Sequence, residues 1–135
     1  MQCAIVLQAI EIIDSDEGAA LRASLMRNIL HLRSALESAN FELLGAPSAI
    51  VPALLGNTAL SRLVTRYTQE AGVIVNLVEY PAVSRNSSRW RLQAMANHEP
   101  RHIDALVDAA VQARKTAAAH LATLENTEDS DAVAA

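Results

Sequence analysis

The stretch EYPAVSRNSSRWRLQAMANHEP, residues 79–100, contains the turn and the strand around which the rest of the chain can be arranged. The part that follows its proline is polar and rich in arginine and serine, which is typical of an exposed turn. In residues 89–95, the apolar Trp90 and Leu92 alternate with polar residues, and this alternation predicts a strand with one buried face. Arg91 is therefore predicted to lie on the face opposite the core.

The segments on either side of this strand alternate between helical and extended patterns. Gly, Pro and Asn residues separate them at the expected ends. We expect helices at 2–13, from a start within 14–18 to Asn40, at 57–72 and from 100 onward, and strands within 41–44, 49–56, 73–80 and 89–95. Pro52 lacks an N–H group, so its strand should be an edge strand or carry a bulge. The predicted fold is a small α/β layer, a short sheet with helices packed against one face.

Three regions are predicted along the chain. Residues 1–40 form N-terminal helices, of which the first is apolar on nearly every side and must be covered by something larger. Residues 41–122 form the small α/β domain. The acidic tail, residues 123–135, is predicted to be disordered because it is polar and built of small residues.

The composition excludes several functions. The 135 residues carry a net charge of −4 and show no basic run interleaved with aromatics, so we expect no nucleic-acid partner. No segment reaches the length of about 20 apolar residues that a membrane span needs. A single cysteine and the lack of a signal-peptide pattern favour a cytoplasmic location.

Few residues are candidates for chemistry. Arg91 in mid-strand either faces solvent, pairs with a carboxylate, or binds an anionic ligand through its planar guanidinium. His98 and His102 have a spacing that can bind zinc, but no third ligand is near and a surface role is the simpler interpretation. Lys115, the only lysine, is predicted to lie on an exposed helix face, whereas a catalytic amine needs a desolvated pocket. Cys3 is predicted to be an inert core residue.

Three segments together resemble one known family. SAIVPALLG (48–56), AGVIVNLVEYPAV (71–83) and SRWRLQAMANH (88–98) resemble the C-terminal portion of the α-oxoamine synthases. These are pyridoxal-phosphate (PLP) enzymes of the class I/II aminotransferase fold, fold type I. They condense an amino acid with an acyl thioester, and their branches make aminolevulinate, 8-amino-7-oxononanoate, 2-amino-3-oxobutyrate and ketosphinganine. The resemblance covers roughly residues 1–115.

The resemblance gives Arg91 a role. In the family, the matching arginine binds the carboxylate of the amino-acid substrate, so Arg91 is the expected substrate-carboxylate ligand. Asn86 stands where the family often has glycine, and Glu79 occupies a position that is basic in some branches. The resemblance implies PLP as cofactor and a homodimer in the intact enzyme. It places the cofactor lysine upstream of the residues present here, so we expect no catalytic residue and no bound PLP in this chain alone.

Several functions stay open from the sequence. The first is the C-terminal part of a PLP-dependent acyltransferase, with an N-terminal PLP domain as its missing partner and with an amino acid and an acyl thioester as substrates. The second is a non-catalytic module that docks on a separate PLP-bearing chain through its first helix. The third is a remnant without function.

Overall fold

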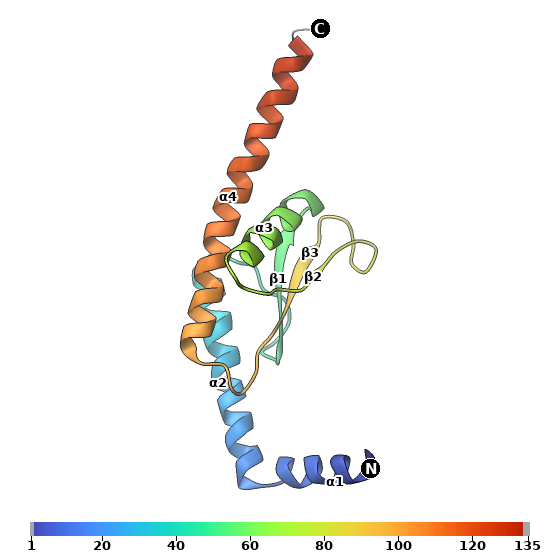
Figure 1. Cartoon of the computed structure of the whole chain (residues 1–135), viewed down its shortest axis with the longest axis vertical. Coiled ribbons are helices and arrows are strands. Elements are labelled where there is room, and N and C mark those ends of the chain that lie inside the picture. The colour runs from blue at the N-terminus through green and yellow to red at the C-terminus, as the bar shows by residue number, and fades with distance from the viewer. Residues whose placement is uncertain (1, 134–135) are drawn as a thin grey trace.

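The molecule is a short sheet flanked on one side by helices (Figure 1). The computed structural model describes the backbone of residues 2–133 and the side chains of residues 3–124. Its elements are α1 (Gln2–Ile13), α2 (Asp16–Ser38), β1 (Ile50–Gly56), α3 (Thr58–Glu70), β2 (Leu77–Val78), β3 (Ser88–Gln93) and α4 (Pro100–Val133). This arrangement confirms the predicted α/β fold class.

Strand β3 is the centre of the sheet. It pairs antiparallel with β1 on one side and with β2 on the other, in the order β1-β3-β2. The register places Pro52 of β1 opposite Arg91 of β3. The Pro52 carbonyl accepts the Leu44 N–H at 3.0 Å on the outer side of β1. Because the N and O atoms of one strand residue point the same way, the missing N–H of Pro52 faces away from β3, as expected for an edge strand.

One face of the sheet carries the core. The buried side chains of β1 alternate with half-buried ones and those of β3 with half-buried or exposed ones, and Trp90 is fully buried between the sheet and α3. Its indole Nε1 donates a hydrogen bond of 2.8 Å to Oγ1 of Thr65 on α3. Helices α2 and α4 close the same layer through buried apolar residues, namely Ile29, Leu32, Leu36, Ile103, Ala110, Ala113 and Ala117.

The helix ends follow local signals in the sequence. Asn57 caps α3, accepting the Leu60 N–H at 2.8 Å, and Ser15 caps α2 by accepting the Gly18 N–H. Gly72 follows α3 with a φ of 87°, a left-handed conformation that suits glycine at the end of a helix. Pro100 begins α4, as predicted.

Two predicted strands are shorter than expected. The strand expected within residues 41–44 is reduced to a single bridge between Leu43 and Ala53, because the chain turns away directly afterwards through Gly45. The strand expected at 73–80 is reduced to Leu77–Val78. One further bond, from the Arg91 N–H to the Asn76 carbonyl at 2.9 Å, extends its pairing. Residues 73–75 run beside α3 instead of pairing with β3.

Helix α1 projects away from the sheet and is widely exposed (Figure 1). Its side chains Ile5, Leu7 and Ile13 are 65%, 62% and 61% exposed. Cys3 is exposed as well, which corrects the prediction that it is a core residue. The sequence prediction assumed that an apolar helix buries its cysteine, but no described element covers this part of α1.

The corner between α1 and α2 is tightly built around Gly18. A Cβ atom at this position would overlap the carbonyl oxygens of Ile12 and Ile13. The Arg22 side chain also reaches back from α2 and donates to the Ile13 carbonyl at 2.5 Å. The angle between the two helices is therefore fixed by backbone contact.

The C-terminal segment differs from the expectation of a disordered tail over residues 123–135. The backbone of α4 continues as a helix to Val133. After Pro100 the sequence contains no further proline or glycine, so no strong helix breaker interrupts the segment. Residues 134 and 135, the end of the predicted tail, lie outside the described residues.

Candidate functional site

Arg91 lies on the exposed face of β3, as the alternation predicted. Its neighbours Trp90 and Leu92 are buried, whereas Arg91 and Gln93 are exposed. Backbone bonding fixes the strand at this point, because the Arg91 N–H donates to the Asn76 carbonyl. The base of the arginine side chain is therefore anchored and its charged end is free to reach outward.

The guanidinium of Arg91 makes no hydrogen bond or ion pair with any side chain that the structure describes. Other arginines are engaged differently. Arg66 pairs with Glu70 at 3.1 Å, and Arg114 donates to the carbonyls of Ala39 and Asn40. Of the three alternatives that the sequence left open for Arg91, pairing with a carboxylate of the described chain is therefore not observed.

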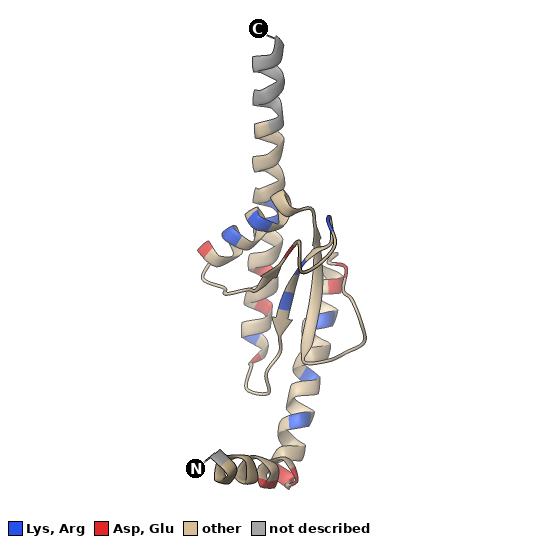
Figure 2. Cartoon of the chain, turned by 90° about the vertical axis from the view of Figure 1, so that its right-hand side faces the viewer, with Lys and Arg blue, Asp and Glu red and all other residues tan. Residues whose placement is uncertain are grey.

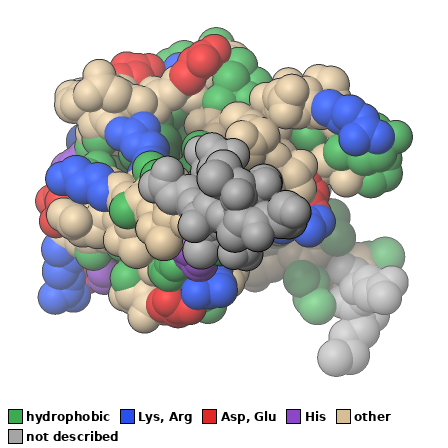
Figure 3. All heavy atoms as spheres, turned by 90° about the horizontal axis from the view of Figure 1, so that it is seen from above, with side chains coloured by type: hydrophobic (Ala, Val, Ile, Leu, Met, Phe, Trp, Pro, Cys, Tyr) green, Lys and Arg blue, Asp and Glu red, His purple; other side chains and the backbone are tan. Residues whose placement is uncertain are grey.

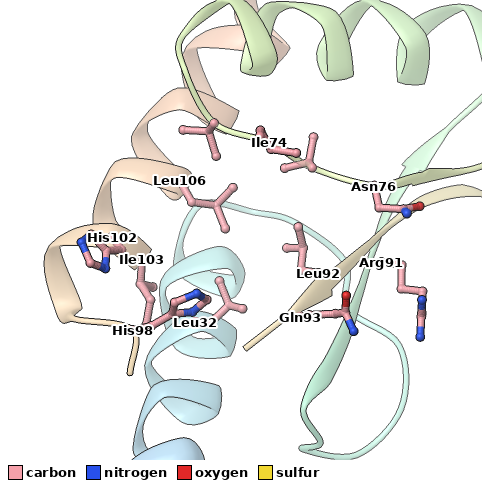
Figure 4. A pocket seen from close by; sticks show the side chains of 12 residues that line it. Leu32, Ile74, Asn76, Arg91, Leu92, Gln93, His98, His102, Ile103 and Leu106 are labelled. Carbon is pink, nitrogen blue, oxygen red and sulfur yellow. The ribbon is translucent and has the colours of Figure 1, made fainter. Parts of the chain in front are cut away.

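A pocket of about 490 Å³ extends from Arg91 across the edge of the sheet to the start of α4 (Figure 4). Its polar residues are Asn76, Arg91, Gln93, His98 and His102, and its apolar wall includes Leu32, Ile74, Leu92, Ile103 and Leu106. The arginine and the two histidines lie at opposite ends of this pocket. It offers cationic and neutral hydrogen-bond donors beside an apolar surface.

The two histidines are not arranged as metal ligands. Nδ1 of His98 accepts the Met95 N–H at 3.4 Å, and Nδ1 of His102 accepts the Glu99 N–H at 3.2 Å. The proton of each neutral ring therefore lies on Nε2, which becomes a donor and has no lone pair for a metal. No group of three potential metal ligands occurs among the described residues.

The turn before β3 carries a second group of charges. Arg62 of α3 forms a bidentate ion pair with Glu79, with Nε–Oε2 at 2.9 Å and Nη2–Oε1 at 2.5 Å. These hydrogen bonds lower the pKa of the Glu79 carboxyl from its ordinary value. The Arg85 guanidinium lies 4.5 Å from the ring centre of Tyr80. Asn86 takes a φ of 63°, which fits its place at a position where the resembled family often has glycine.

Acidic and basic residues are otherwise spread over the helices and the sheet (Figure 2). The face seen in Figure 3 mixes acidic, basic and apolar side chains. Lys115 is exposed on α4, as predicted, and lines neither the Arg91 pocket nor a second pocket beside Tyr80 and Arg85. No helix within the described residues has both the length and the apolar character of a membrane span.

Sequence reasoning missed one residue of this region. Asn28 on α2 is only 8% exposed and contacts the connection between β3 and α4. A signal was present, because Asn28 falls at the helical spacing of Leu25 and Leu32, inside an apolar stripe. A polar residue in such a stripe needs buried hydrogen-bond partners.

Comparison with known proteins places the chain in a family. The model of the aminotransferase class I and II family matches residues 2–109. The chain belongs to this family. It is 36% identical over 107 residues to the 2-amino-3-ketobutyrate coenzyme A ligase of Salmonella typhimurium, covering 78% of this chain and 27% of the relative. It is also 36% identical over 101 residues to the 8-amino-7-oxononanoate synthase of Geobacter sulfurreducens, covering 75% and 26%.

Solved structures share the fold. A serine palmitoyltransferase variant from S. paucimobilis with bound PLP superposes with a TM-score of 0.69 at 22% identity, covering 76% of this chain and 26% of that one. The relatives are α-oxoamine synthases, so the resemblance noted in the sequence is confirmed. The chain spans about a quarter of the length of these relatives.

The family enzymes use PLP, and the described residues can be compared with what this cofactor needs. A lysine that binds PLP covalently must lie in a desolvated pocket. Lys115 is the sole lysine of the chain and is exposed. By themselves, the residues that the structure describes do not fit a PLP site.

Proposed function

We propose that this chain forms the substrate-carboxylate-binding part of a PLP-dependent α-oxoamine synthase, an enzyme that condenses an amino acid with an acyl thioester. Arg91 is the residue that binds the amino-acid carboxylate. The observation that carries this proposal is its guanidinium, which has no ion-pair partner among the described side chains and projects from the central strand of the sheet. A guanidinium binds a carboxylate with two parallel hydrogen bonds, and lysine reproduces this geometry poorly.

The proposal does not require activity from the 135 residues alone. Because the only lysine is exposed, we infer that catalysis needs PLP-bearing residues outside this chain.

The acyl donor is a separate question. Glu79 pairs with Arg62 and stands at the position that is basic in some family branches. A carboxylate there would repel an acyl donor that carries a terminal carboxylate of its own. This favours an acyl chain without a terminal carboxylate.

A hybrid enzyme tests the role of Arg91. The 107-residue segment of the Salmonella typhimurium ligase that aligns with this chain would be replaced by the corresponding residues of this chain. Glycine, alanine and serine would then be titrated separately while the visible absorbance of PLP is followed. Loss of one charge-assisted contact costs about 1.5–3 kcal/mol, so Arg91→Ala should weaken amino-acid binding roughly 10- to 150-fold. Arg91→Lys should recover little of this loss.

Arg89 provides the matched control. It lies two residues earlier on the same strand face, and its Nε donates to the Ser87 carbonyl at 3.0 Å. Arg89→Ala should weaken binding less than Arg91→Ala. The melting temperature should change little in the Arg91 variants, since no core contact is removed. Intact amino-acid affinity combined with a collapsed melting temperature in Arg91→Ala would show that Arg91 is a structural residue.

One observation favours a second function. The exposed apolar side chains of α1 suit a module that docks on a separate PLP-bearing chain. Co-expression with the remaining part of the Salmonella typhimurium ligase tests this possibility. Co-purification that is lost in Ile5→Lys and kept in the control Gln8→Lys would support docking through α1. Equal co-purification of both variants would exclude it.

A further inference from the structure

Asn28 connects α2 to the segment that joins β3 to α4. Its Nδ2 donates to the carbonyls of Met95 at 2.9 Å and His98 at 2.8 Å, with a longer contact of 3.4 Å to Ala96. Ser24, one helical turn earlier, donates through Oγ to the same Ala96 carbonyl at 2.9 Å. One face of α2 thus holds three carbonyls of a single short connection.

This connection needs such donors. Strand β3 ends at Gln93 and α4 begins at Pro100, so the backbone between them lacks the regular partners of a strand or helix. An amide NH₂ group has two protons, which match the two short bonds of Asn28. Aspartate has nearly the same shape but is acceptor-only when ionised, and it would face these carbonyls with negative charge.

The same connection determines the direction of a side chain in the Arg91 pocket. The His98 ring lines the pocket (Figure 4), and its Nδ1 accepts the Met95 N–H. The carbonyls of both residues, Met95 and His98, are the ones that Asn28 binds most closely. Asn28 therefore binds the backbone of both residues, Met95 and His98, whose mutual hydrogen bond fixes the direction of the imidazole.

We propose that Asn28 is a positioning residue of the pocket: by binding the 95–98 backbone it keeps His98 as a neutral Nε2–H donor toward the part of the Arg91-bound ligand that reaches the α4 end of the pocket. The inference rests on the proposed role of Arg91 for the identity of that ligand. His98 then contributes a hydrogen bond to an uncharged or anionic oxygen, and Asn28 acts only through His98 and the loop.

Nuclear magnetic resonance on the ¹⁵N-labelled 135-residue chain tests the positioning directly. In the parent, the His98 ring nitrogens should report the Nε2–H tautomer. In Asn28→Asp, the tautomers should mix, and the amides of Met95 and His98 should exchange about tenfold faster or more relative to the buried Ala110 amide in α4. Normalising to Ala110 removes any general loss of stability. Arg27→Gln, an exposed change on the neighbouring residue, should match the parent.

Ser24→Ala keeps the test decisive if Asn28→Asp does not fold. It removes one bond to the same loop and should accelerate the Met95 and His98 amides by a smaller factor. Unchanged tautomer and unchanged relative exchange in the folded variants would overturn the inference, even if their melting temperatures fall.

The hybrid enzyme separates this inference from the proposed function. If both are correct, Asn28→Asp weakens amino-acid binding while Arg27→Gln does not, and Arg91→Ala weakens it as well. Normal binding in Arg91→Ala would refute the proposed function. Weakened binding in Arg91→Ala together with normal binding in Asn28→Asp would overturn only the role of Asn28.

Discussion

The hydrogen bond between Trp90 and Thr65 joins α3 to the buried face of β3, opposite the face that carries Arg91. Thr65→Val removes the hydroxyl while nearly preserving the side-chain shape. The Trp90 indole N–H is fully buried and would lose its acceptor at 2.8 Å. The Ser61 carbonyl, which accepts from Thr65 Oγ1 at 2.7 Å, keeps its helical N–H partner.

The expected cost is therefore that of one buried donor left without a partner, about 1–3 kcal/mol. For a domain of this size, that loss lowers the melting temperature by roughly 3–12 °C. Unfolding can be followed through the fluorescence of Trp90, the only tryptophan of the chain.

Thr68→Val is the matched control for this measurement. Thr68 lies on the same helix, is fully buried, and donates to the Val64 carbonyl at 2.8 Å. Its hydroxyl has no indole partner, so its loss should cost distinctly less than that of Thr65. Equal melting temperatures for the two variants would refute the reasoning, because the cost would then come from the helix and not from the indole.

Three further predictions concern the surface and the cofactor. Mixing the chain with PLP should give no stoichiometric band of lysine-bound PLP, and a band that disappears in Lys115→Ala would contradict this. The exposed apolar α1 should cause self-association, which sedimentation would detect and Ile5→Lys should reduce. The ion pair of Arg62 lowers the pKa of Glu79, so its small stabilisation is present at neutral pH and is lost as the pH falls through that lowered pKa. The difference in melting temperature between the parent and Glu79→Gln should accordingly vanish in acid, and a difference that persists there would exclude the pair as its cause.

The roles of Asn28 and Arg91 differ in how far the sequence predicts them. Arg91 is visible because its strand neighbours set its direction, and family resemblance suggests its ligand. For Asn28, its place in an apolar helix stripe predicts only that it needs hydrogen-bond partners. The carbonyls it binds lie 67 to 70 positions away in the chain, and no local pattern names them.

Features that depend on neighbouring residues can be predicted from the amino-acid order alone. Strand alternation placed Trp90 inside and Arg91 outside, because successive side chains of a strand point to opposite faces. Asn57 and Gly72 marked the ends of α3 through capping and a left-handed backbone conformation. These signals act over a few residues and need no knowledge of the fold.

Features that join distant segments become visible only in the folded chain. Folding reduced two predicted strands to a bridge and a two-residue strand, since pairing depends on what the partner backbone offers. It left Cys3 and the apolar α1 exposed, because burial is a property of what packs on a surface and not of the surface alone. Folding also brought Asn28 to the loop that carries His98, and it placed His98 and Arg91 in the same pocket. Hydrogen bonds between elements form only after the helices have packed on the sheet.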